Sequence, residues 1–350
     1  MKICIVGNWR FEQYEPAFAR ALESLGHQVV EFSVTPFFTG PIGIVQQVIP
    51  FPGAAFLRLN KKLLNFVRQE KPDLTIFWRS THILPNTIIK IKDLGVVTIS
   101  YNNDDPFGPQ AHGNVPWHHH FLWWWYLRCL QHFNFNFFYR KINCEEAKSY
   151  GAKHADVLLP YFLPWNDKPI SLDINEKNIF KADVVFVGHY EADGRLGHLR
   201  ALLDAGINVK LWGGHYWSPK NMGDLYKSLA PIVPVEGVDY RKALSGANIC
   251  LCFLSKLNRD TYTRRCFEIP ACGKVMLAER TDDLLNMFKE DEEACFFSSS
   301  AELVKKTKWL LNNPELRLKI AKAGFNRVWS DGHDVNNRAS WFLKAISTDN

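Results

Sequence analysis

The sequence lacks the features that define several classes of protein. Among its 350 residues, no stretch reaches the ~18 apolar residues that a membrane-spanning helix requires. Residues 1–7 are too few for the apolar region of a signal peptide, and they predict a first core strand instead. None of the eight cysteines forms a C-x-x-C pair and several lie inside apolar runs, which indicates reduced, buried thiols in a cytosolic protein.

The sequence also lacks a large excess of positive or negative charge. The 42 Lys and Arg residues exceed the 36 Asp and Glu residues by only 6, and the surplus is spread over both halves of the chain. A nucleic-acid-binding protein usually clusters its positive charge on one face, so we expect no nucleic-acid partner. The mild surplus favours small anionic ligands or an acidic membrane surface only weakly.

Strand and helix signals alternate along the chain and predict two α/β units, each with a parallel sheet covered by helices on both faces. A proline-containing segment at 160–181 predicts a linker. We expect an amino-terminal domain at 1–165, a carboxy-terminal domain at 166–334, and a last helix at 335–350 that returns to the first domain. The expected strands are 2–6, 28–33, 74–78, 96–101, 135–139, 183–187, 208–212, 249–254 and 274–278. The expected helices are 11–25, 54–70, 84–93, 195–205, 239–246, 262–272, 300–312, 314–330 and 335–347.

Ligands of open parallel sheets bind beyond the carboxyl ends of the strands, so the residues that follow each strand are the first candidates. The first strand is followed by Gly7, Asn8, Trp9 and Arg10, where a glycine lets the backbone approach a ligand and the next helix offers free N–H groups. Arg10 is a candidate ligand contact, although a tight strand-to-helix turn explains Gly7 on its own. The sequence contains neither G-x-G-x-x-G nor a Walker A motif.

Two adjacent carboxylates, Asp104 and Asp105, follow the expected strand at 96–101. At this position they could act as a catalytic base or orient a hydroxyl group. A turn before Pro106 explains them equally well, because aspartates favour such turns. Both interpretations stay open from the sequence.

Another expected strand is followed by a glycine and, a few residues later, by an arginine. Gly188 and His189 follow the expected strand at 183–187, and Arg195 opens the next helix. A glycine turn with an arginine near a helix N-terminus can hold a diphosphate. An ordinary surface arginine is the alternative.

The segment 260–273 carries the strongest signal, because it places charged residues between two expected strands. Asp260 and Glu268 are eight residues apart, with Arg264 and Arg265 between them. A carboxylate accepts two hydrogen bonds from ribose or sugar hydroxyls, and a neighbouring arginine can neutralise a phosphate. An unpaired charge inside an apolar helix is costly, which argues against a purely packing role for Glu268.

Arg265–Gly273 resembles the R-x-F-E-x-x-A-x-G signature of GT-B glycosyltransferases, and most of all the group related to the spore maturation protein CgeB. The resemblance covers roughly residues 180–345 and is diffuse over the first half, where mainly 103–106 is similar. It implies two Rossmann-like, doubly wound domains with a cleft between them. Further segments similar to that group are 183–188, 279–284, 296–298, 310–317 and 323–324.

In this family the carboxy-terminal domain binds a nucleotide-activated sugar and the amino-terminal domain binds the acceptor. The resemblance implies that Glu268 binds the ribose hydroxyls, and that Arg195 with Arg264 or Arg265 faces the diphosphate. Asp260 stands where many relatives have a glutamate near the sugar, and Lys256 is the nearest candidate for the usual lysine. The implied donor-binding residues are Gly188, His189, Arg195, Lys256, Asp260, Arg264, Arg265, Glu268 and Gly273. Asn8, Trp9 and Arg10 are the acceptor-side candidates, and Asp104 and Asp105 are the catalytic ones.

Together these observations predict a metal-independent glycosyltransferase of the hexosyltransferase type. The resemblance implies that it needs no bound cofactor, because GT-B enzymes often use cationic side chains and helix N-termini to stabilise the leaving diphosphate. Its expected substrates are a nucleoside-diphosphate sugar and a sugar, lipid-linked or protein acceptor, as in the synthesis of bacterial cell-surface or spore polysaccharide. A catalytically silent GT-B-like binding or scaffold protein and a sugar-nucleotide epimerase are the alternatives.

Aromatic residues are concentrated at 117–139, where 11 of 23 residues are Phe, Trp or Tyr, and no acidic residue occurs from 106 to 144. Trp and Tyr favour membrane interfaces, and Arg128 and Arg140 nearby suit anionic lipid. Trp117–Tyr126 therefore predicts peripheral contact with the inner face of a membrane, a role in lining the cleft, or packing beside the cleft. The histidines at 118–120 lack cysteine or carboxylate partners, so we expect no metal there.

Overall fold

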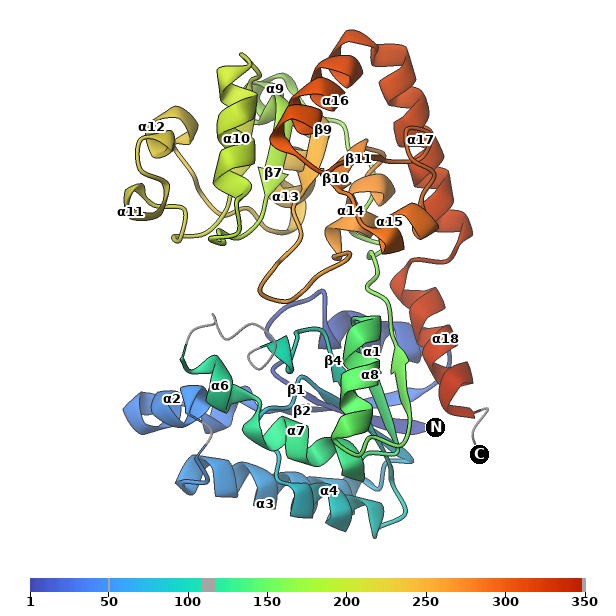
Figure 1. The fold of residues 1–350 in the computed structure, drawn as a ribbon. Helices are drawn as coiled ribbons and strands as arrows, with labels where there is room; N and C mark the ends of the chain where they lie inside the picture. Colours follow the sequence, from blue (N-terminus) through green and yellow to red (C-terminus); the bar gives the residue numbers. More distant parts are fainter. Residues whose placement is uncertain (50, 109–116, 348–350) are drawn as a thin grey trace. The chain divides into compact units, whose positions relative to one another are not determined.

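The computed structural model describes residues 1–49, 51–108 and 117–347, which form two compact α/β units (Figure 1). The first unit consists of the chain up to Leu159 together with the helix that begins at Val335. The second unit is Pro160–Asp334. Each unit has its own sheet, and all strand pairs in both sheets are parallel.

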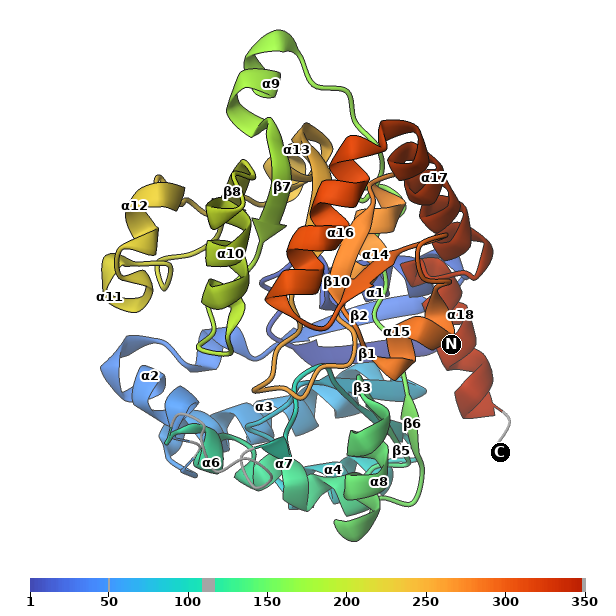
Figure 2. The same ribbon diagram turned by 45° about the horizontal axis from the view of Figure 1, so that its top comes forward.

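The sheet of the first unit has the strand order β2-β1-β3-β4-β5-β6 (Figure 2). Its central strands are apolar because helices cover both faces, and every residue of β3 is buried. The strands are β1 (Lys2–Gly7), β2 (Gln28–Ser33), β3 (Leu74–Trp78), β4 (Val97–Asn102), β5 (Phe135–Phe138) and β6 (Ala155–Val157).

The last helix, α18 (Val335–Ser347), packs within the first unit. It contacts α1, where the ring centres of Phe342 and Phe18 lie 5.4 Å apart. Its buried residues recur on one face and complete the apolar core on that side of the sheet. The other described helices of this unit are α1 (Glu15–Ser24), η1 (Thr35–Phe37), α2 (Gly40–Val48), α3 (Ala54–Glu70), α4 (Pro85–Lys92), α6 (His119–Leu122), α7 (Trp124–Cys129), η2 (Leu130–His132) and α8 (Lys141–Ser149).

The sheet of the second unit has the order β11-β10-β9-β7-β8. Phe186, Leu199 and Leu303 are fully buried in the core that the sheet forms with its covering helices. The strands are β7 (Ala182–Val187), β8 (Val209–Trp212), β9 (Ala247–Cys252), β10 (Met276–Glu279) and β11 (Cys295–Phe297). The helices are α9 (Ile174–Phe180), α10 (Arg195–Asp204), α11 (Pro219–Met222), α12 (Leu225–Leu229), α13 (Gly237–Gly246), α14 (Arg265–Ala271), α15 (Asp282–Met287), α16 (Ser300–Asn312) and α17 (Pro314–Ser330).

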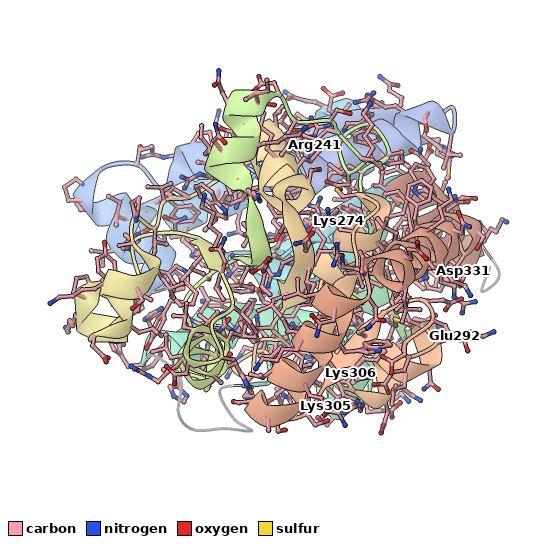
Figure 3. The ribbon with its side chains drawn as sticks, turned by 90° about the horizontal axis from the view of Figure 1, so that it is seen from above. Arg241, Lys274, Glu292, Lys305, Lys306 and Asp331 are labelled. Atoms are coloured by element: carbon pink, nitrogen blue, oxygen red, sulfur yellow. The ribbon has the colours of Figure 1, made fainter. Side chains whose placement is uncertain are left out.

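Ion pairs connect the end of β10 to helix α16. Arg280 Nη2 lies 2.7 Å from Glu302 Oε1 and 2.5 Å from Glu290 Oε1. Lys306, labelled in Figure 3 on α16, lies 3.3 Å from the same Glu290 oxygen. Because these groups are partly exposed, water screens their attraction, and the apolar core remains the main source of stability.

The structure departs from the expected secondary structure at 160–181 and has a helix at 40–48 that was not among the expected elements. The segment 160–181 is more than a linker, since a capping box between Asp173 and Glu176 starts helix α9. Helix α2 was not expected, because its glycines and Pro41 have the composition of a loop. The expected strands at 28–33 and 74–78 coincide with β2 and β3.

All eight cysteines are buried and free, as their place in apolar runs predicts. Burial raises the pKa of the Cys4 thiol to about 12 and that of Cys250 to about 12 as well. A thiol that stays protonated is a poor nucleophile and metal ligand. These cysteines therefore act as small apolar core residues.

We predict that Gly246→Ala destabilises the second unit. Gly246 ends helix α13, and a Cβ at this position would lie 2.4 Å from the carbonyl oxygen of Phe180. The backbone must shift, so the free energy of unfolding should fall by about 1–3 kcal/mol in urea titrations. Gly197→Ala is the matched control, because a Cβ there meets nothing within 4 Å and should stabilise α10 by about 0.5–1 kcal/mol. Equal stability of the two variants would contradict the close approach at Gly246.

Candidate functional site

The strand order of the second unit reverses between β7 and β9, and ligands of open parallel sheets bind at the carboxyl edge of such a switch point. The segments that leave these two strands contact each other there. Ser255 Oγ donates to Glu191 Oε2 at 2.8 Å, and Lys256 Nζ donates to the Asp193 carbonyl at 2.8 Å. The two loops thus form one polar cluster.

Arg195 opens helix α10 inside this cluster, and its side chain is only 3% exposed. Its Nε donates to Asp193 Oδ1 at 2.8 Å, and an Nη atom donates to the carbonyl of His189, which follows Gly188. The guanidinium carbon lies 5.8 Å from the ring centre of Phe253. The structure therefore places Arg195 at the carboxyl edge, where Asp193 balances its charge.

Glu268 lies on α14, and one ion pair and one hydrogen bond hold its largely buried carboxylate. Arg264 Nε lies 2.7 Å from Glu268 Oε1, and the Tyr240 hydroxyl donates to Oε2 at 2.9 Å. Arg264 also pairs with Asp167 at 3.3 Å. Burial and the charge of Glu268 raise the pKa of Asp167 to about 6, while Arg264 opposes this rise. The Glu268 carboxylate is thereby fixed in one orientation, with an acceptor lone pair left on each oxygen.

Arg265 differs from Arg264 beside it, because Arg264 forms ion pairs with Glu268 and Asp167 whereas no ion pair of Arg265 is found among the described residues. Its Nε atom is buried and has no hydrogen-bond partner among the described residues. Its guanidinium carbon lies 5.7 Å from the ring centre of Phe186 on β7. Burial, followed by the charges of Arg265 and Arg195, lowers the pKa of His189, so these three groups share one environment. A buried guanidinium nitrogen without an acceptor is costly, and an anionic ligand beside it would remove that cost.

Asp260 lies in the loop after β9, where its N–H donates to the Ser255 carbonyl at 2.8 Å. This turn brings Asp260 back toward the cluster. Burial raises the pKa of the Glu191 carboxyl, Arg195 opposes the rise, and the charges of Asp193 and Asp260 add to it. Asp260 and Glu191 therefore act on each other across the ends of β7 and β9.

Gly273 does not join this cluster. It follows α14 with a φ of 70° and leads into β10, so it lies at the amino edge of the sheet. This is the left-handed residue that commonly ends a helix. Its predicted role in donor binding is not supported by this position.

A cavity of about 360 Å³ lies at the carboxyl edge of the first unit's sheet. Its lining includes Asn8 after β1, Arg79 after β3 and Asp104 after β4. Glu15 of α1 accepts from the N–H of Asn8 at 2.8 Å, and Gly7 leaves the space for it, since a Cβ there would lie 2.2 Å from Glu15 Oε1. A volume of this size suits a small molecule (~300–1,000 Å³).

The two adjacent aspartates have different environments. Asp104 lines the cavity and pairs with Arg79. Asp105 is buried, and its Oδ1 accepts from the N–H groups of Phe107 at 3.1 Å and Gly108 at 2.9 Å. The turn interpretation therefore describes Asp105, whose predicted catalytic role is not supported by this burial.

The three candidate residues for acceptor binding, Asn8, Trp9 and Arg10, also have different environments. Asn8 lines the cavity, whereas Trp9 and Arg10 are not among the described residues that line it. The Trp9 indole N–H donates to the Ile5 carbonyl at 3.3 Å. Arg10 is exposed, and its guanidinium carbon lies 5.3 Å from the ring centre of Phe11. Arg10 thus contacts the lining residue Phe11, but neither Trp9 nor Arg10 is among the described lining residues.

His82 is a buried histidine of the cavity wall that sequence analysis did not single out. Its Nε2 donates to the carbonyls of Gln46 and Gln47 at 3.1 Å each, and its Nδ1 accepts from the Thr81 hydroxyl at 2.7 Å. Burial lowers the pKa of His82 to about 4, with a smaller contribution from Arg79. Neutral His82 therefore holds the end of α2 against the sheet.

Other residues of the sites were missed for two reasons. Glu191 and Asp193 follow Gly188 within five residues, so an analysis of the whole loop after β7 would have found them. Tyr240 and Asp167 lie 28 and 97 residues from the partners they bond. No local pattern indicates contacts of that kind.

The aromatic segment Trp117–Tyr126 is divided between core and surface. Trp123 and Tyr126 are buried, and the Tyr126 hydroxyl lies 2.8 Å from Ser100 Oγ. Trp117 and Trp124 are exposed. The packing interpretation is therefore correct for Trp123 and Tyr126.

Two features are absent from the part of the chain that the structure describes. None of its helices is both long enough and apolar enough to cross a membrane. Within the same residues, no three His, Cys, Asp or Glu side chains are grouped so that they could hold a metal ion.

Residues 195–344 match the model of a family described as glycosyl transferase-like. A sequence comparison with curated proteins gives no match. Similar solved structures include sucrose-phosphate synthase from Thermosynechococcus elongatus, with a TM-score of 0.73 and 12% identity over 99% of this chain and 98% of that one. HepE from Anabaena, in complex with UDP and glucose, has a TM-score of 0.65 and 12% identity over 99% of this chain and 100% of that one.

A protein from Listeria monocytogenes assigned as a UDP-N-acetylglucosamine 2-epimerase is also similar. Its TM-score is 0.56 and its identity 12%, over 100% of this chain and 96% of that one. At such identities the likeness shows the fold. The expected fold class, two Rossmann-like α/β domains as in GT-B proteins, is confirmed.

We predict that His82 makes the stability of the first unit depend on pH. Its folded pKa of about 4 lies below the ordinary 6.5, so the unfolded chain binds the proton first as the pH falls. The contribution is complete above pH 6.5 and is lost toward pH 4, by about 2 kcal/mol between pH 7.5 and 5. Urea titrations of the wild type and of His82→Gln should differ by this amount in their pH dependence. The exposed His154→Gln is the control, and a wild-type profile no steeper than that of His82→Gln would disprove the assignment.

Proposed function

We propose that the protein is a glycosyltransferase that moves a sugar from a nucleoside-diphosphate sugar to an acceptor. The observation that carries this proposal is the buried, unpartnered Nε of Arg265 beside the carboxyl edge of β7. A diphosphate is the anion that suits this position, because Arg195 and the N-terminus of α10 lie at the same edge. The match of residues 195–344 to a glycosyl transferase-like family supports the proposal, since that segment contains both arginines.

The donor's ribose is assigned to Glu268. Its carboxylate is held by Arg264 and Tyr240 and keeps lone pairs free to accept from two vicinal hydroxyls. The structural likeness to HepE, which is solved with UDP and glucose, makes a uridine nucleotide and a hexose the first donors to test. Within the GT-B proteins, the signature at Arg265–Gly273 favours the CgeB-related group.

In the proposed transfer step, negative charge develops on the diphosphate that leaves the sugar. The acceptor oxygen bonds to the anomeric carbon while the bond from that carbon to the diphosphate breaks, and the acceptor's proton passes to a base. Negative charge then grows on the leaving diphosphate, where Arg265 stabilises it most because, among the described residues, no carboxylate pairs with it directly as Asp193 pairs with Arg195. This arrangement requires no metal ion.

The acceptor is assigned to the cavity of the first unit. Amide and hydroxyl side chains such as Asn8 and Ser80 line it together with the rings of Tyr14 and Trp78, a combination that suits a hydroxyl-bearing acceptor. Asp104 is the carboxylate we assign as the proton acceptor, since Asp105 is committed to its turn.

Two other functions are each favoured by one observation. The likeness to the Listeria protein favours a sugar-nucleotide epimerase, which would turn over the donor without any acceptor. The balanced pairs of Arg195 and Arg264 favour a silent binding protein, which would bind UDP without turnover. Measuring donor turnover with and without an acceptor panel separates these three functions.

We predict that Arg265→Met weakens UDP binding at least about tenfold in calorimetry, the cost of losing one charge-assisted contact. Because the variant removes a buried nitrogen that has no acceptor, its melting temperature should equal or exceed that of the wild type. Arg200→Met is the matched control, since Arg200 is an exposed residue of α10 that pairs with Asp224. Undiminished UDP affinity of Arg265→Met would place the diphosphate elsewhere.

We predict that Glu268→Gln lowers donor turnover at least about tenfold, because an amide accepts hydrogen bonds from the ribose on one atom only. Hydrolysis or transfer would be followed by release of the nucleoside diphosphate. Glu302→Gln on α16 is the control for loss of a charge in the same unit. Turnover equal to that of the wild type would exclude Glu268 from the site.

A further inference from the structure

Helix α2 exposes apolar side chains to an unusual degree. Ile42 is 73% exposed, and Ile44 and Val45 are more than half exposed. Two residues beyond the helix, Ile49 and Phe51, are exposed as well, and Phe51 reaches 73%. The helix contains no charged residue. Exposed apolar surface of this kind marks an interaction site in a folded protein.

The exposed residues of helices α6, α7 and α3 extend this surface. Trp117, Phe121 and Trp124 are exposed around α6 and α7, and Leu57 is exposed on α3. In Figures 1 and 2, α2 and α6 lie on the same side of the first unit. We call these residues the α2–α7 face: Ile42, Ile44, Val45, Ile49, Phe51, Leu57, Trp117, Phe121 and Trp124.

Side-chain contacts fix the elements of the face to one another. Gln46 of α2 accepts from the N–H groups of Ala55 and Phe56 at the start of α3, at 3.1 and 3.3 Å. The ring of Phe56 lies 6.0 Å from that of Trp125 on α7. The face is therefore a built surface rather than three independent helices.

The charge of the face has one sign. No acidic residue occurs in 32–69 or in 106–144, the two stretches of the sequence that contain its residues. Exposed cations lie on the same helices: Arg58, Lys61 and Lys62 on α3, and Arg128 on α7. The Arg128 guanidinium carbon lies 3.6 Å from the ring centre of Trp124.

We propose that the α2–α7 face binds the surface of an anionic lipid bilayer. Aliphatic and Trp side chains enter the interface, while Lys and Arg beside them meet lipid phosphates. Contact between two copies of the face would bring cations of like sign together, which disfavours a dimer. Helices α2 and α6 also supply Gln47 and Leu122 to the cavity wall, so docking would bring the cavity to the bilayer. The idea that the bilayer presents an acceptor to the cavity rests on the proposed function. The binding of the face to the bilayer does not depend on it.

The experiment measures co-sedimentation of the full chain with vesicles of phosphatidylcholine alone and with phosphatidylglycerol added. The expected result is binding to the anionic vesicles that weakens as salt is raised. Ile42→Ser/Ile44→Ser/Phe51→Ser should abolish it, and Lys61→Glu/Lys62→Glu should weaken it at least about tenfold. Melting temperature and UDP affinity, measured on each variant, keep this test separate from folding and from the proposed function.

Matched changes on the second unit serve as controls. Ile174→Ser/Ile179→Ser removes exposed apolar residues of α9, and Lys305→Glu/Lys308→Glu reverses exposed charges of α16, where Figure 3 labels Lys305. Both should bind vesicles like the wild type. Absence of vesicle binding, or equal loss in face and control variants, would overturn the proposal, and so would a stable dimer in light scattering that the face variants dissociate.

Discussion

The parallel direction of all strands in each sheet is the constraint on which the rest of the structure depends. Because the carboxyl ends meet at one edge, each segment that leaves a strand contributes its first side chains there, together with the free N–H groups of the next helix. In the second unit this edge collects Arg195, Lys256 and Arg265, and in the first it collects Asn8 and Asp104. Side chains far apart in the sequence become neighbours for this one reason.

Charge balance separates the structural arginines of the second unit from the one assigned to a ligand. Arg195 is balanced by Asp193, and Arg264 by Glu268, in pairs that need no ligand. Arg265 has a buried Nε without an acceptor, which costs folding free energy. A buried polar group that lowers the free energy of unfolding until an anion binds beside it is typical of a binding site.

How much the sequence could predict depends on whether the signal is local. The apolar runs of β2 and β3 are bounded by turn residues, and their predicted ranges agree with the structure. The hydrogen bond between Tyr240 and Glu268 joins residues 28 positions apart and forms only when α13 and α14 have packed. No local sequence pattern therefore predicts it. Trp123 and Trp124 are adjacent in one aromatic run, yet one is 3% and the other 48% exposed, since Trp123 lies in the turn between α6 and α7 and Trp124 begins α7.

In the proposed reaction, the donor binds at the charged edge of the second unit's sheet. The acceptor binds in the polar and aromatic cavity of the first unit. A crystal structure of the full chain with UDP tests the central claim most directly. The proposed donor site predicts diphosphate oxygens within hydrogen-bond distance of the Arg265 guanidinium and ribose hydroxyls on the Glu268 carboxylate. UDP bound away from the carboxyl edge of β7 and β9, with the Arg265 Nε still lacking an acceptor, would contradict it.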